Sequence, residues 1–215
     1  MLIIALINYG AGNLCSASRA IDRVAREQNV SCDIKVTDDP EIICRADLLV
    51  LPGVGAFASC YKKLTAVPGM IEALEESVLQ RGRPFFGICV GMQLMAEYGH
   101  EFTSHVGLGW IPGNVFKITS KDPQLKVPHM GWNELYTIQD THPMLRNLPS
   151  DPHAYFVHSY HFTCTDSQHC LAVTDYGSNI CAVISRDNLI GTQFHPEKSQ
   201  VVGLTILANF LCWRP

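Results

Sequence analysis

The first hundred residues alternate short apolar runs with amphipathic segments, a pattern typical of a parallel sheet covered by helices. Runs of apolar residues predict buried strands, and apolar residues at helical spacing predict helices between them. Asn13 is placed to cap the first helix, whose apolar side includes Ala17, Ile21 and Val24. The expected strands are residues 2–8, 32–36, 48–51 and 85–88, and the expected helices are residues 14–28 and 70–81.

Beyond residue 114 the pattern changes to shorter β-type segments separated by Gly, Asn, Asp and Pro. We expect these segments to form a mixed or antiparallel extension of the same sheet, followed by a docked helix over residues 201–213. No Pro- or Ser-rich linker marks a boundary, so residues 1–215 are expected to form one α/β domain. The expected strands are residues 115–119, 154–162, 171–174, 182–185 and 189–194.

Charge and cysteine content exclude several classes of protein. Sixteen Lys and Arg against twenty Asp and Glu give a net charge of −4, without a clustered basic stripe, which argues against a nucleic-acid partner. No apolar run approaches the length of a membrane span. The nine cysteines are scattered without a C-x-x-C pair, which favours a reducing cytoplasm over a zinc site or a disulfide framework.

Cys89 lies in Gly87-Ile88-Cys89-Val90-Gly91, between an expected strand and a segment able to form a helix. This is the context of a nucleophile elbow with Cys in place of Ser. Small residues two before and two after the nucleophile let the backbone turn sharply and hold the side chain above the sheet. The alternative is one buried cysteine among nine, but the strand, the glycines and the expected helix favour a nucleophile.

His195 and Glu197 follow the last expected strand. In extended backbone, residues two apart project to the same side, so the two side chains are expected to meet. The carboxylate would orient the imidazole, and the imidazole would take the proton of Cys89. Read alone, the pair is more typical of a surface contact, but beside the cysteine elbow it supplies the two missing members of a triad.

Two glycine-containing loops follow expected strands. Gly53 and Gly55 lie in the loop after residue 51, where backbone N–H groups, together with that of Val90, can face a developing oxyanion. The alternative is an ordinary Pro-Gly turn. The other loop, Tyr9-Gly10-Ala11-Gly12-Asn13, lacks the third glycine of a dinucleotide-binding motif, because Cys15 occupies that place. We interpret it as a tight strand-to-helix turn.

Together these motifs resemble the class I (triad) glutamine amidotransferases, whose elbow reads G-x-C-x-G-x-Q and whose His and Glu lie in H-P-E. The resemblance covers essentially the whole chain. Within the class, residues 128–133 (Pro-His-Met-Gly-Trp-Asn) and the Gly12-Asn13-Leu14 opening resemble the family of glutaminase subunits of imidazole glycerol-phosphate synthases. The resemblance implies a flavodoxin-like fold with a mostly parallel central sheet flanked by helices. It also implies hydrolysis of glutamine to glutamate and ammonia without a cofactor or metal.

The resemblance further implies a partner, a synthase subunit of (β/α)₈ fold in a heterodimer. That subunit uses the ammonia to make imidazole glycerol phosphate and AICAR in histidine biosynthesis. By resemblance, Cys89 is the nucleophile, His195 the acid and base, and Glu197 its orienter. The implied oxyanion and substrate-binding residues are Gly53, Val54, Gly55, Val90, Gln93, Glu101, Ser159 and Tyr160, and the implied partner-facing residues are Trp132, Tyr155 and Lys198.

Three alternatives remain at this stage. A glutaminase for another acceptor, in anthranilate, cofactor or surface-sugar synthesis, would be expected to have replaced the 128–133 signature, which is intact. A silent regulatory binding module would be expected to have lost a triad residue, and all three are present. A cysteine hydrolase of γ-glutamyl peptides would release ammonia at full rate without a partner. For Trp132, ordinary core packing is the alternative to a partner contact.

Overall fold

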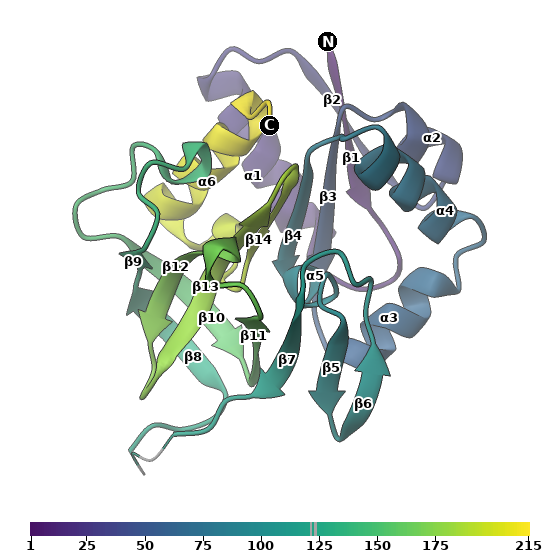
Figure 1. Cartoon of the computed structure of the whole chain (residues 1–215). Coiled ribbons are helices and arrows are strands. Elements are labelled where there is room, and N and C mark those ends of the chain that lie inside the picture. Colours follow the sequence, from purple (N-terminus) through teal and green to yellow (C-terminus); the bar gives the residue numbers. More distant parts are fainter. Residues whose placement is uncertain (121, 123) are drawn as a thin grey trace.

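The computed structural model describes residues 1–120, 122 and 124–215, and its centre is an eight-stranded mixed sheet. The strand order is β2-β1-β3-β4-β14-β13-β12-β9. The neighbours from β2 to β14 run parallel, and the pairs from β14 to β9 run antiparallel. Helices α1 and α6 lie on one side of the sheet and α2, α3 and α4 on the other (Figure 1). This is the α/β architecture that the apolar pattern predicts.

The described chain contains the following elements, in order: β1 (Leu2–Ile7), α1 (Leu14–Glu27), β2 (Cys32–Thr37), α2 (Pro40–Arg45), β3 (Leu48–Gly53), α3 (Phe57–Thr65), α4 (Met70–Leu74), the π-helix η1 (Glu75–Gln80), β4 (Phe85–Cys89), α5 (Val90–Gln93), β5 (Tyr98–Glu101), β6 (Thr103–Val106), β7 (Gly113–Lys117), β8 (His129–Glu134), β9 (Tyr136–Thr137), the 3₁₀ turn η2 (Pro143–Leu145), β10 (His153–His158), β11 (Tyr160–Cys164), the 3₁₀ turn η3 (Ser167–His169), β12 (Cys170–Asp175), β13 (Asn179–Arg186), β14 (Leu189–Thr192), the 3₁₀ turn η4 (Pro196–Lys198) and α6 (Gln200–Cys212).

The strands and the first helix that the apolar pattern predicts in the first hundred residues are confirmed, and their burial agrees with that pattern. Every residue of β3 and β4 is buried, as a strand covered on both faces requires. Helix α1 buries one stripe, and the Asn13 side chain accepts a hydrogen bond from Ser16 N at 3.4 Å, which confirms the cap. The loop before α1 is the expected tight turn, with Gly10 at φ +78° and Gly12 at φ +103°.

Two helices between the central strands have no counterpart in the sequence prediction. Helix α2 is short, although Asp39 caps it and Pro40 begins it, which is a recognisable start signal. Helix α3 has no side-chain cap of its own; instead Glu101, in β5, accepts a hydrogen bond from Phe57 N at 2.8 Å. A cap 44 residues away in sequence cannot be read from the local pattern.

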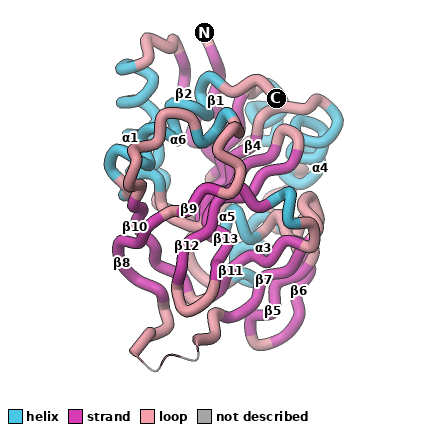
Figure 2. Tube along the Cα trace, turned by 60° about the vertical axis from the view of Figure 1, so that its left-hand side comes forward, coloured by secondary structure: helices cyan, strands magenta, loops and turns pink. Residues whose placement is uncertain are grey.

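The second half departs from the expected single extension of the sheet. Strands β12, β13 and β14 do extend it, but β7 belongs to a separate sheet of order β11-β7-β5-β6, and β8 pairs with β10 alone. Residues 154–162 were expected to be one strand, and this is wrong. The strand is interrupted at Ser159: β10, before it, pairs with β8, and β11, after it, pairs with β7. In Figure 2 the β8–β10 pair lies apart from the sheet that contains β5, β7 and β11.

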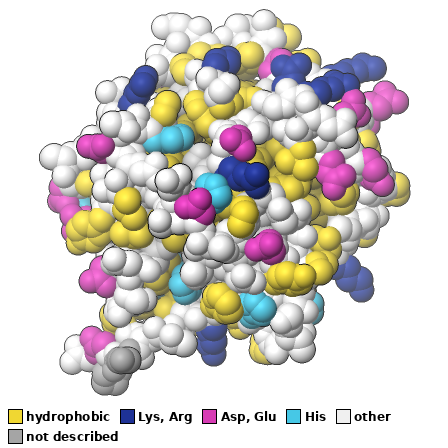
Figure 3. All heavy atoms as spheres, in the orientation of Figure 1, with side chains coloured by type: hydrophobic (Ala, Val, Ile, Leu, Met, Phe, Trp, Pro, Cys, Tyr) yellow, Lys and Arg dark blue, Asp and Glu magenta, His cyan; other side chains and the backbone are white. Residues whose placement is uncertain are grey.

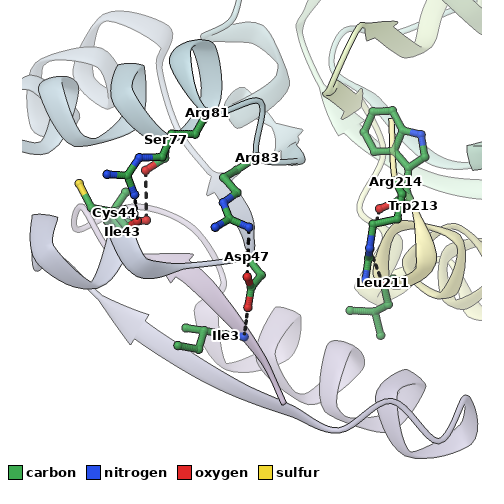
Figure 4. Close-up of polar contacts among 10 residues, drawn as sticks. All are labelled: Ile3, Ile43, Cys44, Asp47, Ser77, Arg81, Arg83, Leu211, Trp213 and Arg214. Atoms are coloured by element: carbon green, nitrogen blue, oxygen red, sulfur yellow. Dashed lines mark hydrogen bonds and ion pairs between the residues drawn. The ribbon is translucent and has the colours of Figure 1, made fainter.

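A polar cluster secures the amino ends of the central strands, away from the carboxyl ends that carry the site (Figure 4). Asp47 accepts a hydrogen bond from Ile3 N at 2.9 Å and forms an ion pair with Arg83 at 3.1 Å. One carboxylate therefore joins the start of β1 to the segments that lead into β3 and β4. Acidic and basic side chains are interspersed on the face shown in Figure 3. No helix in the described part of the chain is long and apolar enough to cross a membrane.

Candidate active site

Cys89 lies at the sharp turn between β4 and α5 and has φ +55°, a left-handed conformation that is strained for a residue with a side chain. The flanking glycines are sterically required. A Cβ on Gly91 would overlap the carbonyl oxygen of Leu51, and a Cβ on Gly87 would lie 2.6 Å from the carbonyl oxygen of Gly91. The expected elbow is therefore present, and the segment after Cys89 forms a single helical turn, α5.

His195 and Glu197 meet as expected, but the reason differs from the prediction. Strand β14 ends at Thr192, and Pro196 begins the 3₁₀ turn η4, so the pair forms across a tight turn and not along an extended strand. His195 Nδ1 lies 2.9 Å from Glu197 Oε1, and both side chains are almost completely buried. Ser199 secures the turn by donating to the His195 carbonyl at 2.7 Å.

The charged form of His195 is stabilised inside the protein. Burial alone disfavours the imidazolium, but contacts with the neighbouring Cys89 thiol and the Glu197 carboxylate outweigh it and raise the pKa of His195 to about 10. A buried histidine that a carboxylate orients beside a cysteine is the arrangement that takes up the thiol proton during attack. This arrangement activates a cysteine nucleophile.

Cys89 and His195 face a cavity of about 340 Å³, the size of a small-molecule site. Of the expected oxyanion and substrate residues, all but Gly53 line it. Sequence reasoning did not place Pro128, Val157 or His158 there. The lining residues are Val54, Gly55, Cys89, Val90, Gln93, Glu101, Pro128, Val157, His158, Ser159, Tyr160 and His195. The structure thus brings together residues from separate regions of the sequence.

Gly53 serves the site in a different way from the one expected. It ends β3 and pairs with Cys89 in the parallel register. A Cβ at this position would lie 2.6 Å from Gly91 N and 2.9 Å from the Val90 side chain, so glycine lets β3 approach the elbow closely. Beyond it, the Val54 carbonyl accepts a hydrogen bond from Cys60 Sγ at 3.5 Å, and Gly55 has φ +115°. The loop therefore contains backbone that favours glycine beside the nucleophile.

Two buried glutamine side chains extend the site behind Cys89. Gln93 Nε2 donates to the Tyr160 carbonyl and to Gln193 Oε1, each at 2.9 Å. Gln193 Nε2 in turn lies 3.7 Å from Cys89 Sγ. Gln93 was expected at the site and Gln193 was not, although Gln193 lies only two residues before His195. The amide groups fix the wall of the cavity around the thiol.

Comparison with known proteins identifies the family. The family described as "Glutamine amidotransferase class-I" matches residues 9–212. The chain belongs to the class I glutamine amidotransferase family. It is 54% identical over 212 residues to the imidazole glycerol phosphate synthase subunit HisH of Rhodospirillum rubrum, covering 99% of both chains. It is 51% identical over 215 residues to the subunit of the same name from Brucella suis, again covering 99% of both.

The fold agrees with solved structures of other glutamine amidotransferases. A glutamine amidotransferase from Thermotoga maritima superposes with a TM-score of 0.60 at 19% identity, covering 91% of this chain and 76% of that chain. A further solved glutamine amidotransferase superposes with a TM-score of 0.68 at 15% identity, covering 95% of this chain and 98% of that chain. At these levels of identity the likeness shows the fold alone. The mixed sheet with flanking helices is thus the fold of a class I glutamine amidotransferase.

Within this amidotransferase, the three residues that resemble partner-facing positions lie together on the surface. The Trp132 and Tyr155 rings meet edge to face with centroids 6.1 Å apart, and Lys198 Nζ lies 5.7 Å from the centroid of the Tyr155 ring. Trp132 and Tyr155 are directly paired residues of β8 and β10. Trp132 is 49% exposed, which excludes ordinary core packing for it. We call Trp132, Tyr155 and Lys198 the aromatic–lysine cluster.

Proposed function

We propose that this chain is the glutaminase subunit of an imidazole glycerol-phosphate synthase, with residues 1–215 forming one glutamine amidotransferase domain. The observation that carries the proposal is the buried His195–Glu197 pair, 2.9 Å apart, whose histidine lines the same cavity as Cys89. The acceptor is inferred from the full-length relatives and from the 128–133 signature, which contributes Pro128 to that cavity.

Glutamine hydrolysis follows from these groups in two stages. In the first, the Cys89 thiolate attacks the side-chain amide carbon, and the N–H groups of Val90 and of the Val54–Gly55 segment stabilise the oxyanion. The His195 imidazolium gives its proton to the amide nitrogen, and the C–N bond breaks. Ammonia leaves, and a γ-glutamyl thioester remains on Cys89.

In the second stage, the now neutral His195 takes a proton from a water molecule as its oxygen attacks the thioester. The C–S bond breaks, glutamate leaves, and the thiolate–imidazolium pair is restored. Glu197 holds His195 Nδ1 throughout, so that Nε2 remains the atom that moves the proton. Glutamine and water are thereby converted to glutamate and ammonia.

The ammonia requires a protected path to its acceptor, because it is protonated at neutral pH in free solution and loses its nucleophilicity. We therefore infer a heterodimer with a (β/α)₈ synthase subunit that binds the aromatic–lysine cluster. We place the reaction in the cytoplasm, where the nine cysteines, all free here, stay reduced. The partner uses the ammonia to make imidazole glycerol phosphate and AICAR.

The Val54–Gly55 segment is suited to switch this activity. Glycine-flanked peptides rotate readily, so an oxyanion N–H can point away from the site until the partner and its ligand favour the productive conformation. The loss of one such donor costs roughly 100- to 1000-fold in rate. An isolated subunit in the unproductive conformation is therefore nearly silent.

The test is to measure glutamate release by the isolated chain, by the chain with a (β/α)₈ synthase subunit, and by that complex with the synthase ligand bound. We expect the rate to rise stepwise, by about 100-fold or more between the first and last conditions. Ammonia use by the complex should yield the imidazole product. Equal rates in all three conditions contradict switching, and full activity without product in the complex contradicts the assigned acceptor.

A further inference from the structure

Two buried histidines form a hydrogen-bonded pair beside the cavity. One belongs to the 128–133 signature and the other to strand β10. His129, the first residue of β8, and His158, the last residue of β10, are directly paired in the antiparallel register. Their rings meet through His129 Nδ1 and His158 Nε2, which are 3.0 Å apart, and His158 Nδ1 lies 2.9 Å from the Tyr160 carbonyl oxygen. The mechanism above uses neither imidazole.

The proton positions in this pair follow from the acceptor at its end. A carbonyl oxygen only accepts, so His158 carries its proton on Nδ1, and its Nε2 is the acceptor for a proton on His129 Nδ1. His129 Nε2 then accepts from Asn133 Nδ2 at 3.2 Å, and that amide also donates to the Asp175 carbonyl in β12 at 2.8 Å. Asn133 therefore anchors the pair to the main sheet, and the ring N–H of each histidine points toward Tyr160.

Burial maintains this arrangement of protons. His129 and His158 are 2% and 6% exposed. Desolvation lowers the pKa of His129 to about 4 and that of His158 to about 3, so both rings are neutral at physiological pH. A neutral imidazole donates from one nitrogen and accepts at the other, as the two contacts of each ring require.

The chain of contacts continues from Tyr160 to the nucleophile. The Tyr160 carbonyl accepts from His158 and also from Gln93 Nε2 at 2.9 Å. Through Gln193, Gln93 is connected to Cys89 Sγ. The Ser159–Tyr160 turn lines the cavity, and it is also the point where the chain leaves one small sheet for another. The Ser159 carbonyl accepts a hydrogen bond from Ile118 N at 2.8 Å, whereas the Tyr160 carbonyl is held by the two side chains.

The two strands that hold the histidine pair also carry exposed residues. Strand β8 alternates, with His129 facing inward and Met130 and Trp132 exposed. Trp132 belongs to the aromatic–lysine cluster, and its paired residue Tyr155 lies in β10, the strand that ends at His158. The two-stranded β8–β10 sheet therefore carries the two aromatic residues of the cluster on its outer face and the histidine pair inside.

We propose that His129 and His158 are positioning residues for glutamine binding, which hold the Tyr160 carbonyl and the Ser159–Tyr160 turn in place through the His158 Nδ1 donor. This inference rests on the proposed glutaminase function. It gives the His and Asn of the 128–133 signature a role inside the protein, separate from the exposed Trp132. Neither imidazole is assigned a part in the bond-making steps.

Two isosteric variants of His158 separate its two contacts. In His158→Asn, the amide nitrogen takes the place of Nδ1 and keeps the donor to Tyr160, but the acceptor for His129 is lost. In His158→Gln, the side-chain amide reaches the place of Nε2, so the oxygen keeps the contact with His129 and the donor to Tyr160 is lost. The matched control is His161→Asn, a change at a largely buried histidine one residue past Tyr160 whose Nδ1 has no partner in the described structure.

The experiment measures kcat and KM for glutamine in the complex with the synthase subunit, together with thermal unfolding of each variant. We expect His158→Gln to raise the KM about three- to tenfold with a smaller change in kcat, the size expected for one net hydrogen bond. His158→Asn should keep the KM near the wild-type value while lowering the melting temperature, because it leaves His129 Nδ1 unpaired in the interior. His161→Asn should leave the KM unchanged.

The inference is overturned if His158→Asn raises the KM for glutamine more than His158→Gln does, since the KM would then follow the loss of stability. It is also overturned if neither variant changes the KM. Activity with added ammonia reports whether each complex is assembled and folded. Wild-type complex that fails to hydrolyse glutamine contradicts the proposed function itself. The two failures are therefore distinguishable in one set of measurements.

Discussion

Cys89 and Gly53 are paired residues at the ends of two adjacent parallel strands, and the elbow is held at the point where they meet. A side chain on Gly53 would collide with the backbone of Gly91, on the other side of the turn. The nucleophile and the loop expected to bind the oxyanion are thus parts of one packed unit.

Replacing Cys89 by Ala or Ser should abolish glutamine hydrolysis, because the attack requires a thiolate. The substitution removes one sulfur from a turn whose shape depends on glycines 87 and 91, so the fold and ammonia-dependent synthesis should persist. Glutamate release and ammonia-dependent product formation in the same preparation check this. Glutaminase activity remaining in a clean Cys89→Ala sample contradicts the triad.

Loss of His195 should cost nearly as much as loss of Cys89, whereas loss of Glu197 should cost less. The carboxylate orients Nδ1 across 2.9 Å but does not transfer the proton itself. Single-turnover rates of His195→Ala and Glu197→Gln, measured with the fold verified by thermal unfolding, give the comparison. If Glu197→Gln proves as damaging as His195→Ala with the fold preserved, the roles need to be reassigned.

The His129–His158 pair should make the protein less stable in acid. Both rings have a lowered pKa in the folded state, about 4 and about 3, so below the ordinary histidine pKa of 6.5 the unfolded chain binds protons that the folded chain does not. The free energy of unfolding should therefore fall as the pH drops from about 6.5 toward 4. His195 acts in the opposite direction near pH 6.5, because its raised pKa keeps it protonated in the folded state while the unfolded imidazole is partly deprotonated, and it adds nothing to the slope well below that pH.

Urea unfolding at a series of pH values measures this slope. The double variant His129→Asn with His158→Asn should be less stable at neutral pH but should show a shallower dependence between about pH 6.5 and 4, because two histidine protons no longer contribute. An unchanged slope in the double variant indicates that other groups dominate acid unfolding.

Trp132→Ala should weaken association with the synthase subunit, by about 2 kcal/mol or more if the indole is a central contact. The side chain is half exposed and meets the Tyr155 ring edge to face, so the isolated chain should keep its stability. Tyr98→Ala, at an exposed aromatic residue of β5 in another sheet, is the matched control. Titration calorimetry measures the affinity of each variant for the synthase subunit. Equal losses of affinity in the two variants rule out the aromatic–lysine cluster as the specific contact.

The sequence predicts the central sheet because β3 and β4 are uniformly apolar and the triad because its motifs are local. It does not predict α3, whose start is capped by Glu101 from β5, or the break at Ser159, where strand partners change without a change in the apolar pattern. It also leaves out Gln193 and His158, because their contacts join residues 104 and 29 positions away. Local patterns determine elements, whereas contacts between distant segments complete the site.

The adjacency of β4 and β14 at the middle of the sheet has a consequence for the order of events during synthesis. Cys89 emerges from the ribosome long before His195 and Glu197, and parallel strands separated by about a hundred residues pair late because of the long loop that must close. Until β14 inserts beside β4, the growing chain has a thiol without its base. The nascent chain is therefore expected to lack glutaminase activity until β14 pairs with β4 and brings His195 to the thiol.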